Sequence, residues 1–190
     1  MKRALLALWS LDSHIRFWIG LGHWLGNRLP VIGLPLSMIV DRIVLVFYNL
    51  DGASRNVFVP DLRIGHPLGV LLGGNGIRSR GTLVVNAGVK FVGKAPDDAE
   101  YLARHAEKRV FDFGHNVVIG SNTVVIGPVT ICDNVVVGAM SLVNRDITEP
   151  GTYAGCPARK ISDEVSLAWA RSAKDPVQAA PSAKSKDSRQ

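Results

Sequence analysis

Five side chains in the middle of the chain carry chemistry beyond packing: His66, His105, His115, Cys132 and Cys156. An imidazole titrates near neutral pH, so a histidine can take a proton from a hydroxyl group and pass it on. The two cysteines lack a CxxC spacing and histidines at ligand spacing, which argues against a disulfide framework and against a zinc site. They fit a reducing compartment. By itself, a lone histidine at a turn is explained by solvent or backbone partners, so the elements around it must decide its role.

A six-residue repeat would position these side chains. Two series of large apolar residues, one on each side of a gap, have this spacing: Leu71, Ile77, Leu83 and Val89, then Phe113, Ile119, Val125, Ile131, Val137 and Val143. In the second series, compact or β-branched residues fill the fifth position of each hexad. A strand repeats every two residues, so a repeat of six indicates a chain that turns after each short strand. The pattern predicts a parallel β-helix of triangular coils, each of about 18 residues, with Ile and Val ladders inside.

Changes in composition and periodicity along the sequence divide the chain into four parts. Residues 1–55 form an N-terminal helical segment, with amphipathic helices expected at 2–26 and 36–50. Residues 56–161 form the β-helix, interrupted at 95–112 by a helix-bearing excursion of eighteen residues that leaves the phase of the hexads unchanged. Residues 162–171 predict a short helix, capped by Ser162, that covers the open end of the stack. Residues 172–190 have a disordered composition.

The distribution of charged and apolar residues along the chain argues against some classes of binding partner. The net charge of +6 is concentrated at the two ends, while the middle is nearly neutral, which argues against a nucleic-acid groove. The N-terminus has no cleavage-site pattern, so we expect no signal peptide. Residues 34–50 are apolar, but Asp41 and Arg42 lie at their centre, so we expect no transmembrane segment. The Trp-rich N-terminal part leaves contact with a membrane surface open.

Three motifs resemble the hexapeptide-repeat acyltransferases, and most closely the serine acetyltransferases: IGHPLGVLLG at 64–73, the hexads at 114–143 and YAGCPARKI at 153–161. The resemblance covers about 62–161. It implies a left-handed β-helix and transfer of an acetyl group from acetyl-CoA to a hydroxyl group, without a metal. It also implies a cytoplasmic protein and a homotrimer, which in this family can pair into a dimer of trimers.

The resemblance also implies roles for individual residues. His66 matches the histidine that acts as general base on the acceptor hydroxyl, and Arg109 matches an arginine of the substrate site. The residues that match the acetyl-CoA site are Gly120, Ser121, Thr123, Gly138, Ala139, Arg159 and Lys160. The sequence departs from the family at Gly65, where an acidic residue is expected, and at Val110, where a second histidine is expected. Loss of the acidic residue puts in doubt an acceptor with an ammonium group, such as serine.

Several alternatives stay open. The acceptor is serine, a similar small molecule, or a sugar hydroxyl of a polysaccharide precursor. A zinc enzyme similar to the hexapeptide-repeat carbonic anhydrases would need His66, His105 and His115 to converge. His105 or His115 could instead assist His66 in place of the missing second histidine. A non-catalytic assembly protein would use the β-helix only to oligomerise.

Overall fold

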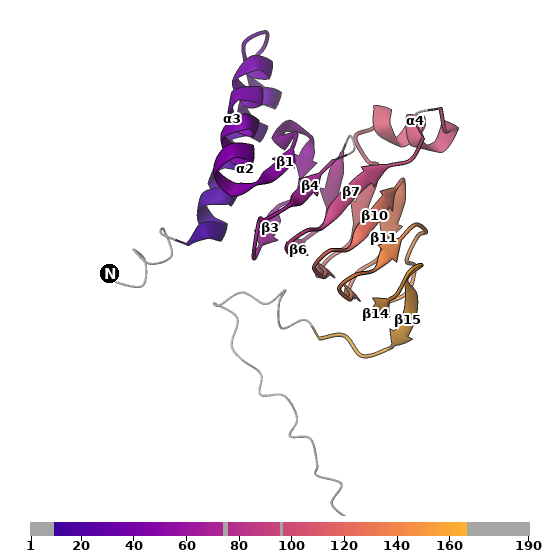
Figure 1. Cartoon of the computed structure of the whole chain (residues 1–190). Coiled ribbons are helices and arrows are strands. Elements are labelled where there is room, and N and C mark those ends of the chain that lie inside the picture. The colour runs from indigo at the N-terminus through magenta and orange to yellow at the C-terminus, as the bar shows by residue number, and fades with distance from the viewer. Residues whose placement is uncertain (1–9, 74–75, 96, 167–190) are drawn as a thin grey trace, which may run out of the picture.

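The protein is a three-sided parallel β-helix with two helices packed on its first coil (Figure 1). The computed structural model describes residues 10–73, 76–95 and 97–166. Helix α4 projects from one side of the stacked coils, away from the end that the first two helices cover (Figure 1). Among the described residues, no helix is long and apolar enough to cross a membrane.

Three sheets form the sides of the prism, and every pairing within the coils is parallel. The first sheet contains β1 (Leu50–Gly52), β4 (Val70–Leu72), β7 (Lys90–Gly93), β10 (Val124–Gly127) and β13 (Leu142–Val143). The second contains β2 (Val57–Phe58), β5 (Ile77–Ser79), β8 (Phe111–Phe113) and β11 (Val129–Ile131). The third contains β3 (Asp61–Ile64), β6 (Thr82–Val85), β9 (Val117–Ile119), β12 (Val135–Val137), β14 (Gly151–Ala154) and β15 (Arg159–Ser162). The first coil thus begins at Leu50, inside the segment that the sequence assigned to helices.

Helices α2 (Leu11–Arg28) and α3 (Gly33–Tyr48) form near the predicted positions. Two carboxylates tie them to the first coil. Asp12 accepts a hydrogen bond from a backbone N–H of β3 at 2.9 Å, and Asp41 accepts one from the N–H that opens η1 (Ser54–Asn56) at 3.0 Å. The helices therefore cap the open end of the stack, as a terminal unit of a repeat protein must.

The six-residue series forms the core, with one exception. Every member except Leu71 is at most 2% exposed. Leu71 is half-buried, because its neighbours Val70 and Leu72 point inward on β4 instead. Consecutive side chains of a strand face opposite sides, so only one parity of a strand can enter the core.

The excursion changes the phase of the hexads, contrary to the prediction. After the excursion, successive coils differ by 18 residues, as from Val117 to Val135 and from Val124 to Leu142, but across the excursion Leu83 lies beside Val117, 34 residues on. The coil that carries the excursion is therefore sixteen residues longer than these coils. Since sixteen is even, the strands after it keep the same side inward even though each series moves by two positions. The excursion contains α4 (Ala99–Ala106), as predicted, and the chain rejoins the prism at β8.

A hairpin closes the C-terminal end of the described coils. Strand β15 pairs antiparallel with β14. Ser162, the predicted helix cap, ends this strand, and residues 163–166 are not helical. The start of the predicted capping helix is therefore wrong, because the chain gains strand pairing there. The remainder of that helix, the predicted disordered tail and the first residues of the N-terminal helix lie outside the described residues.

Candidate active site

The turns that join the third sheet to the first stack into one edge of the prism, which we call the His66 edge: residues 65–69, 86–89, 120–123 and 138–141. Backbone hydrogen bonds join each turn to the next. The N–H of Gly88 donates to Leu68, that of Asn122 to Ala87 and that of Met140 to Ser121, at 2.8 to 2.9 Å. The structure therefore brings the predicted base onto the same edge as the predicted acetyl-CoA residues at 120–123 and 138–139.

Each turn of the His66 edge needs one left-handed residue. The φ angles are 68° at Gly69, 70° at Gly88, 57° at Asn122 and 58° at Met140. Glycine and asparagine tolerate this region, whereas a methionine there is uncommon. The last turn of the edge is consequently held in a backbone conformation that its side chain does not favour.

His66 stands exposed on this edge beside a hollow of about 520 Å³. The hollow is lined by His66 itself and by Leu11, Val46, Phe47, Tyr48, Asn49, Pro67, Leu68 and Ala87. The lining thus combines the turn with the end of α3 and the start of α2. Within the described residues, no group forms a hydrogen bond with the imidazole of His66. The ring is accordingly available to accept a proton, and none of the described residues that line the hollow has a carboxylate that could hold an ammonium group.

The small residues of the edge have mixed structural roles. A Cβ on Gly120 would lie 2.5 Å from the backbone nitrogen of Ala139, so this glycine is needed for the close approach of two coils. Thr123 is fully buried, and its hydroxyl donates to the carbonyl of Gly138 at 3.0 Å. The side chain of Thr123 therefore stabilises the turn and is closed to a ligand. Ser121 is half-buried and Ala139 is exposed, which leaves this pair accessible.

Arg159 and Lys160 lie on β15, directly after the turn that continues the His66 edge beyond residue 141. Arg159 is exposed, and its guanidinium donates to the carbonyl of Ala158 at 3.0 Å. Lys160 is paired with Asp163 at 2.7 Å and with Glu149 at 3.2 Å, and both carboxylates raise its pKa. A phosphate group would have to compete with these carboxylates for Lys160, while Arg159 has no such partner among the described residues.

Arg109 lies on a different edge, at the end of the excursion between the first and second sheets. Its guanidinium pairs with Asp112 and, at 3.7 Å, with Glu107. These acidic neighbours raise the pKa of Arg109. One protomer does not bring Arg109 to the hollow of His66, so its role in a substrate site stays a prediction that needs a second protomer.

The other two histidines of the central region occupy the remaining edges. His105 lies on α4, and His115 lies in a turn from the second sheet to the third. Its backbone N–H donates to Asp133, which also binds Arg80 at 2.9 Å. Over the part of the chain that the structure describes, no group of three His, Cys, Asp or Glu side chains could hold a metal ion.

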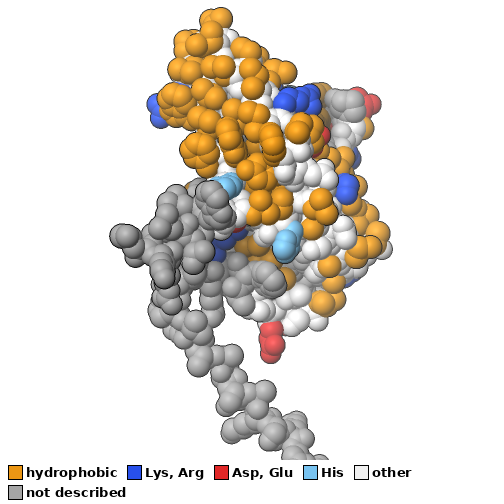
Figure 2. Space-filling view, turned by 60° about the vertical axis from the view of Figure 1, so that its left-hand side comes forward, with side chains coloured by type: hydrophobic (Ala, Val, Ile, Leu, Met, Phe, Trp, Pro, Cys, Tyr) orange, Lys and Arg blue, Asp and Glu red, His pale blue; other side chains and the backbone are white. Residues whose placement is uncertain are grey.

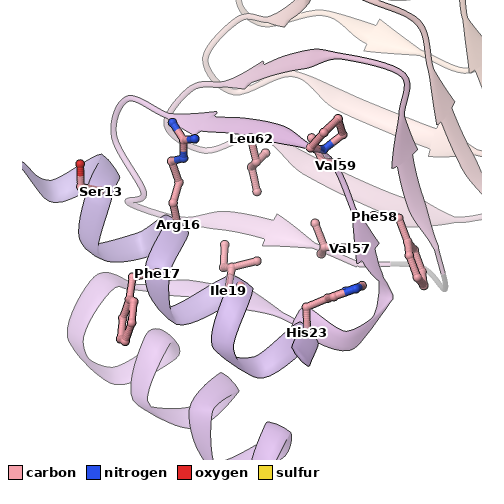
Figure 3. A pocket seen from close by; sticks show the side chains of 11 residues that line it. Ser13, Arg16, Phe17, Ile19, His23, Val57, Phe58, Val59 and Leu62 are labelled. Carbon is pink, nitrogen blue, oxygen red and sulfur yellow. The ribbon is translucent and has the colours of Figure 1, made fainter. Parts of the chain in front are cut away.

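A larger hollow, of about 670 Å³, was not predicted from the sequence (Figure 3). It lies between α2 and strands β2 and β3, with Ile19 and Val57 on its apolar floor and His23 and Arg16 at its sides (Figure 3). The His23 ring packs edge-on against Phe58 at 5.0 Å. Helix packing creates this hollow, so no local sequence signal could have indicated it.

Comparisons with known proteins agree with this geometry. The bacterial transferase hexapeptide family (six repeats) matches residues 113–145. The chain is 32% identical to the serine acetyltransferase of Synechococcus elongatus over 142 residues, which are 73% of this chain and 52% of the relative. It is 48% identical to the galactoside O-acetyltransferase of Escherichia coli over 50 residues, which are 26% of this chain and 25% of the relative.

Solved structures show the same fold. Soybean serine acetyltransferase complexed with serine has a TM-score of 0.63 at 20% identity, over 77% of this chain and 56% of that chain. A serine acetyltransferase in complex with CoA has a TM-score of 0.60 at 20% identity, over 80% and 58%. The chain spans about half the length of the serine acetyltransferases that it matches. These likenesses confirm the predicted resemblance and the left-handed β-helix.

Proposed function

We propose that this chain, a hexapeptide-repeat protein of the acyltransferase type, transfers an acetyl group from acetyl-CoA to a hydroxyl acceptor with His66 as general base. The observation that carries the proposal is the position of His66. Its imidazole is exposed, has no hydrogen-bond partner among the described residues, and shares one edge with the small residues expected to face acetyl-CoA. The named activities of the relatives, serine acetyltransferase and galactoside O-acetyltransferase, support the same reaction class.

The reaction needs one base and one site for an oxyanion. His66 takes the proton of the acceptor hydroxyl while its oxygen attacks the thioester carbon, because an alcohol is too weak an acid to attack unaided. Backbone N–H groups stabilise the negative oxygen of the tetrahedral intermediate. The carbon–sulfur bond then breaks, and the imidazolium returns the proton to the thiolate of CoA. The products are an O-acetyl ester and free CoA.

The CoA arm would lie along the His66 edge. Of the residues that match the acetyl-CoA site, Ser121 and Ala139 have accessible side chains there, and Gly120 and Gly138 let neighbouring turns of the edge stack closely. Arg159 would meet the phosphates of the nucleotide end.

The acceptor is a small hydroxyl compound, either serine or a sugar. One observation favours the sugar: no carboxylate stands among the described lining residues of the His66 hollow to pair with the ammonium group of serine. A sugar hydroxyl makes no such demand.

We further propose a homotrimer in the cytoplasm. A trimer would allow Arg109 of one protomer to reach the hollow of another, which one chain alone does not achieve. Cys132 and Cys156 are both free, which fits a reducing compartment. Light scattering at about three times the chain mass of 20.5 kDa would support the trimer, and pairing into hexamers would double that mass.

Thiol release from acetyl-CoA tests the function across a panel of serine, homoserine and nucleotide sugars. We expect at least one acceptor to stimulate release, and His66→Ala to lower the rate about a hundredfold or more. His115→Ala, on another edge of the same protomer, should retain activity, and a loss there would instead assign His115 as the assisting histidine. Full activity in His66→Ala would remove His66 as the base. Absence of thiol release with every acceptor would favour an assembly protein, and stoichiometric zinc in the purified protein would favour the carbonic anhydrase-like alternative.

A further inference from the structure

The helical end of the molecule presents a large apolar surface to solvent (Figure 2). We call it the α3 face. Its side chains are Phe17 (63% exposed), Trp24 (52%), Val31 (92%), Ile32 (58%), Leu34 (48%), Leu36 (37%), Met38 (50%), Ile39 (57%), Val46 (76%) and Phe47 (76%). Contiguous apolar surfaces of this kind on soluble domains mark interaction sites.

Helix α3 buries small side chains and exposes large ones. The residues that it buries against the protein are Gly33, Ser37, Val40 and Val44. The residues that it exposes include leucines, an isoleucine, a methionine and a phenylalanine. An ordinary surface helix buries its largest apolar side chains. The large apolar side chains that α3 exposes therefore indicate a contact with a partner outside the described residues.

The acidic and basic side chains of the two helices also differ in exposure. Their two acidic side chains, Asp12 and Asp41, are half-buried, and both accept hydrogen bonds from the coil. The exposed charged residues on the two helices are Arg16, Arg28 and Arg42, and the exposed Asp51 of β1 lies at the border of the face, in a hollow that Met38 and Arg42 also line. Arg16 pairs with Asp61 at 3.3 Å, which leaves Arg28 and Arg42 as cations without a carboxylate partner among the described residues.

We propose that the α3 face docks on an anionic lipid bilayer. Among the described residues of the two helices, aromatic and large aliphatic side chains are exposed together with arginines and without an exposed carboxylate, which suits the boundary between headgroups and acyl chains of an anionic bilayer. The arginines would meet lipid phosphates while the apolar side chains enter the acyl boundary.

Docking would place the hollow of His66 at the bilayer surface. Val46 and Phe47 belong to the α3 face and also line the hollow beside Leu68. The apolar surface and the candidate site are therefore continuous. This second step rests on the proposed function, because only an acetyl transfer gives the hollow a reaction to perform.

Vesicle sedimentation of the full chain tests the docking without any acceptor. We expect binding to phosphatidylcholine vesicles that contain roughly one third phosphatidylglycerol, and weaker binding to phosphatidylcholine alone. The double variant Val46→Glu with Phe47→Glu should lower binding about tenfold or more. Both side chains are 76% exposed, so the fold should persist. Leu102→Glu on α4, at 52% exposed, is the matched control and should bind as the wild type does.

Two further measurements sharpen the test. Arg28→Glu with Arg42→Glu should abolish the preference for phosphatidylglycerol. An environment-sensitive fluorophore at Leu68→Cys, in a background with Cys132→Ala and Cys156→Ser, should shift to the blue when vesicles are added. The same fluorophore at Leu102→Cys should not shift.

Wild-type protein that stays in the supernatant, or an α3-face variant that binds as the wild type does, would overturn the docking. A fluorophore that shifts equally at both positions would overturn the placement of the hollow. A fall in solution mass on substitution of the α3 face, with vesicle binding unchanged, would assign the face to a second copy of the chain. Thiol release measured without vesicles separates the two proposals, since its failure contradicts the proposed function and leaves the docking standing.

Discussion

The coils and the helical end treat their apolar residues in opposite ways. In the coils, large side chains such as Phe91, Phe111 and Phe113 are fully buried. In α3, the buried stripe is made of small residues, and Phe47 is 76% exposed. The coils use hydrophobic burial to fold, whereas the helical end retains apolar surface that folding of the described chain does not use. Apolar content alone therefore does not tell the core of this protein from its surface.

A phenylalanine from each region gives the largest expected contrast. Phe113 is fully buried and packs against Phe91 with ring centroids 5.6 Å apart, so Phe113→Ala should destabilise the protein by about 3–5 kcal/mol. Phe47→Ala should change stability by no more than about 0.5 kcal/mol, because the ring is mostly in water. Urea unfolding midpoints at one protein concentration measure both. Equal losses would show that the α3 face is covered within the folded protein.

Glycines make the same contrast on a smaller scale. A Cβ on Gly120 would meet the neighbouring coil at 2.5 Å, so Gly120→Ala should cost about 1–3 kcal/mol. A Cβ on Gly20, inside α2, meets nothing within 4 Å, and Gly20→Ala should stabilise the protein by about 0.5–1 kcal/mol. Thermal unfolding of the pair provides the measurement. Stabilisation by both variants would contradict the close stacking of the coils at the His66 edge.

The coils could be predicted from the sequence because each repeat presents the same physical requirement to its neighbours. Two details failed for local reasons. Leu71 and Leu72 are adjacent and equally apolar, so the series alone could not say which one points inward. The shift after the excursion could not be predicted from the series, because an insertion of an even number of residues keeps the same side of each strand inward, and the residues at both candidate positions are apolar.

The candidate site could be predicted only in part. The resemblance assigned His66 and the small turn residues to one reaction, and the structure places them on one edge, because turns of a β-helix that are one coil apart stack. The hollow beside His66 could not be predicted, since Val46 and Phe47 reach it through the packing of α3 on the first coil. The separation of Arg109 from His66 could not be predicted either, because it depends on which edge of the prism each turn occupies.

Asp61, where the two regions meet, should give the smallest effect. Burial alone raises the pKa of Asp61, but hydrogen bonds from Arg63 and Thr82 and the charge of Arg16 on α2 lower it overall below its ordinary value of 3.8. The unfolded chain therefore binds this proton more readily than the folded protein does. The contribution of Asp61 to stability is present above about pH 4 and disappears as the pH falls through the folded pKa.

We expect Asp61→Asn to remove less than about 1 kcal/mol at neutral pH and to reduce the dependence of stability on pH below about pH 4. Arg16→Ala, which leaves the carboxylate in place, should remove only the share that the helical end supplies. Urea midpoints at about pH 6 and about pH 3 measure both variants, and an unchanged pH dependence in Asp61→Asn would mean that this carboxylate does not join the helices to the coils electrostatically.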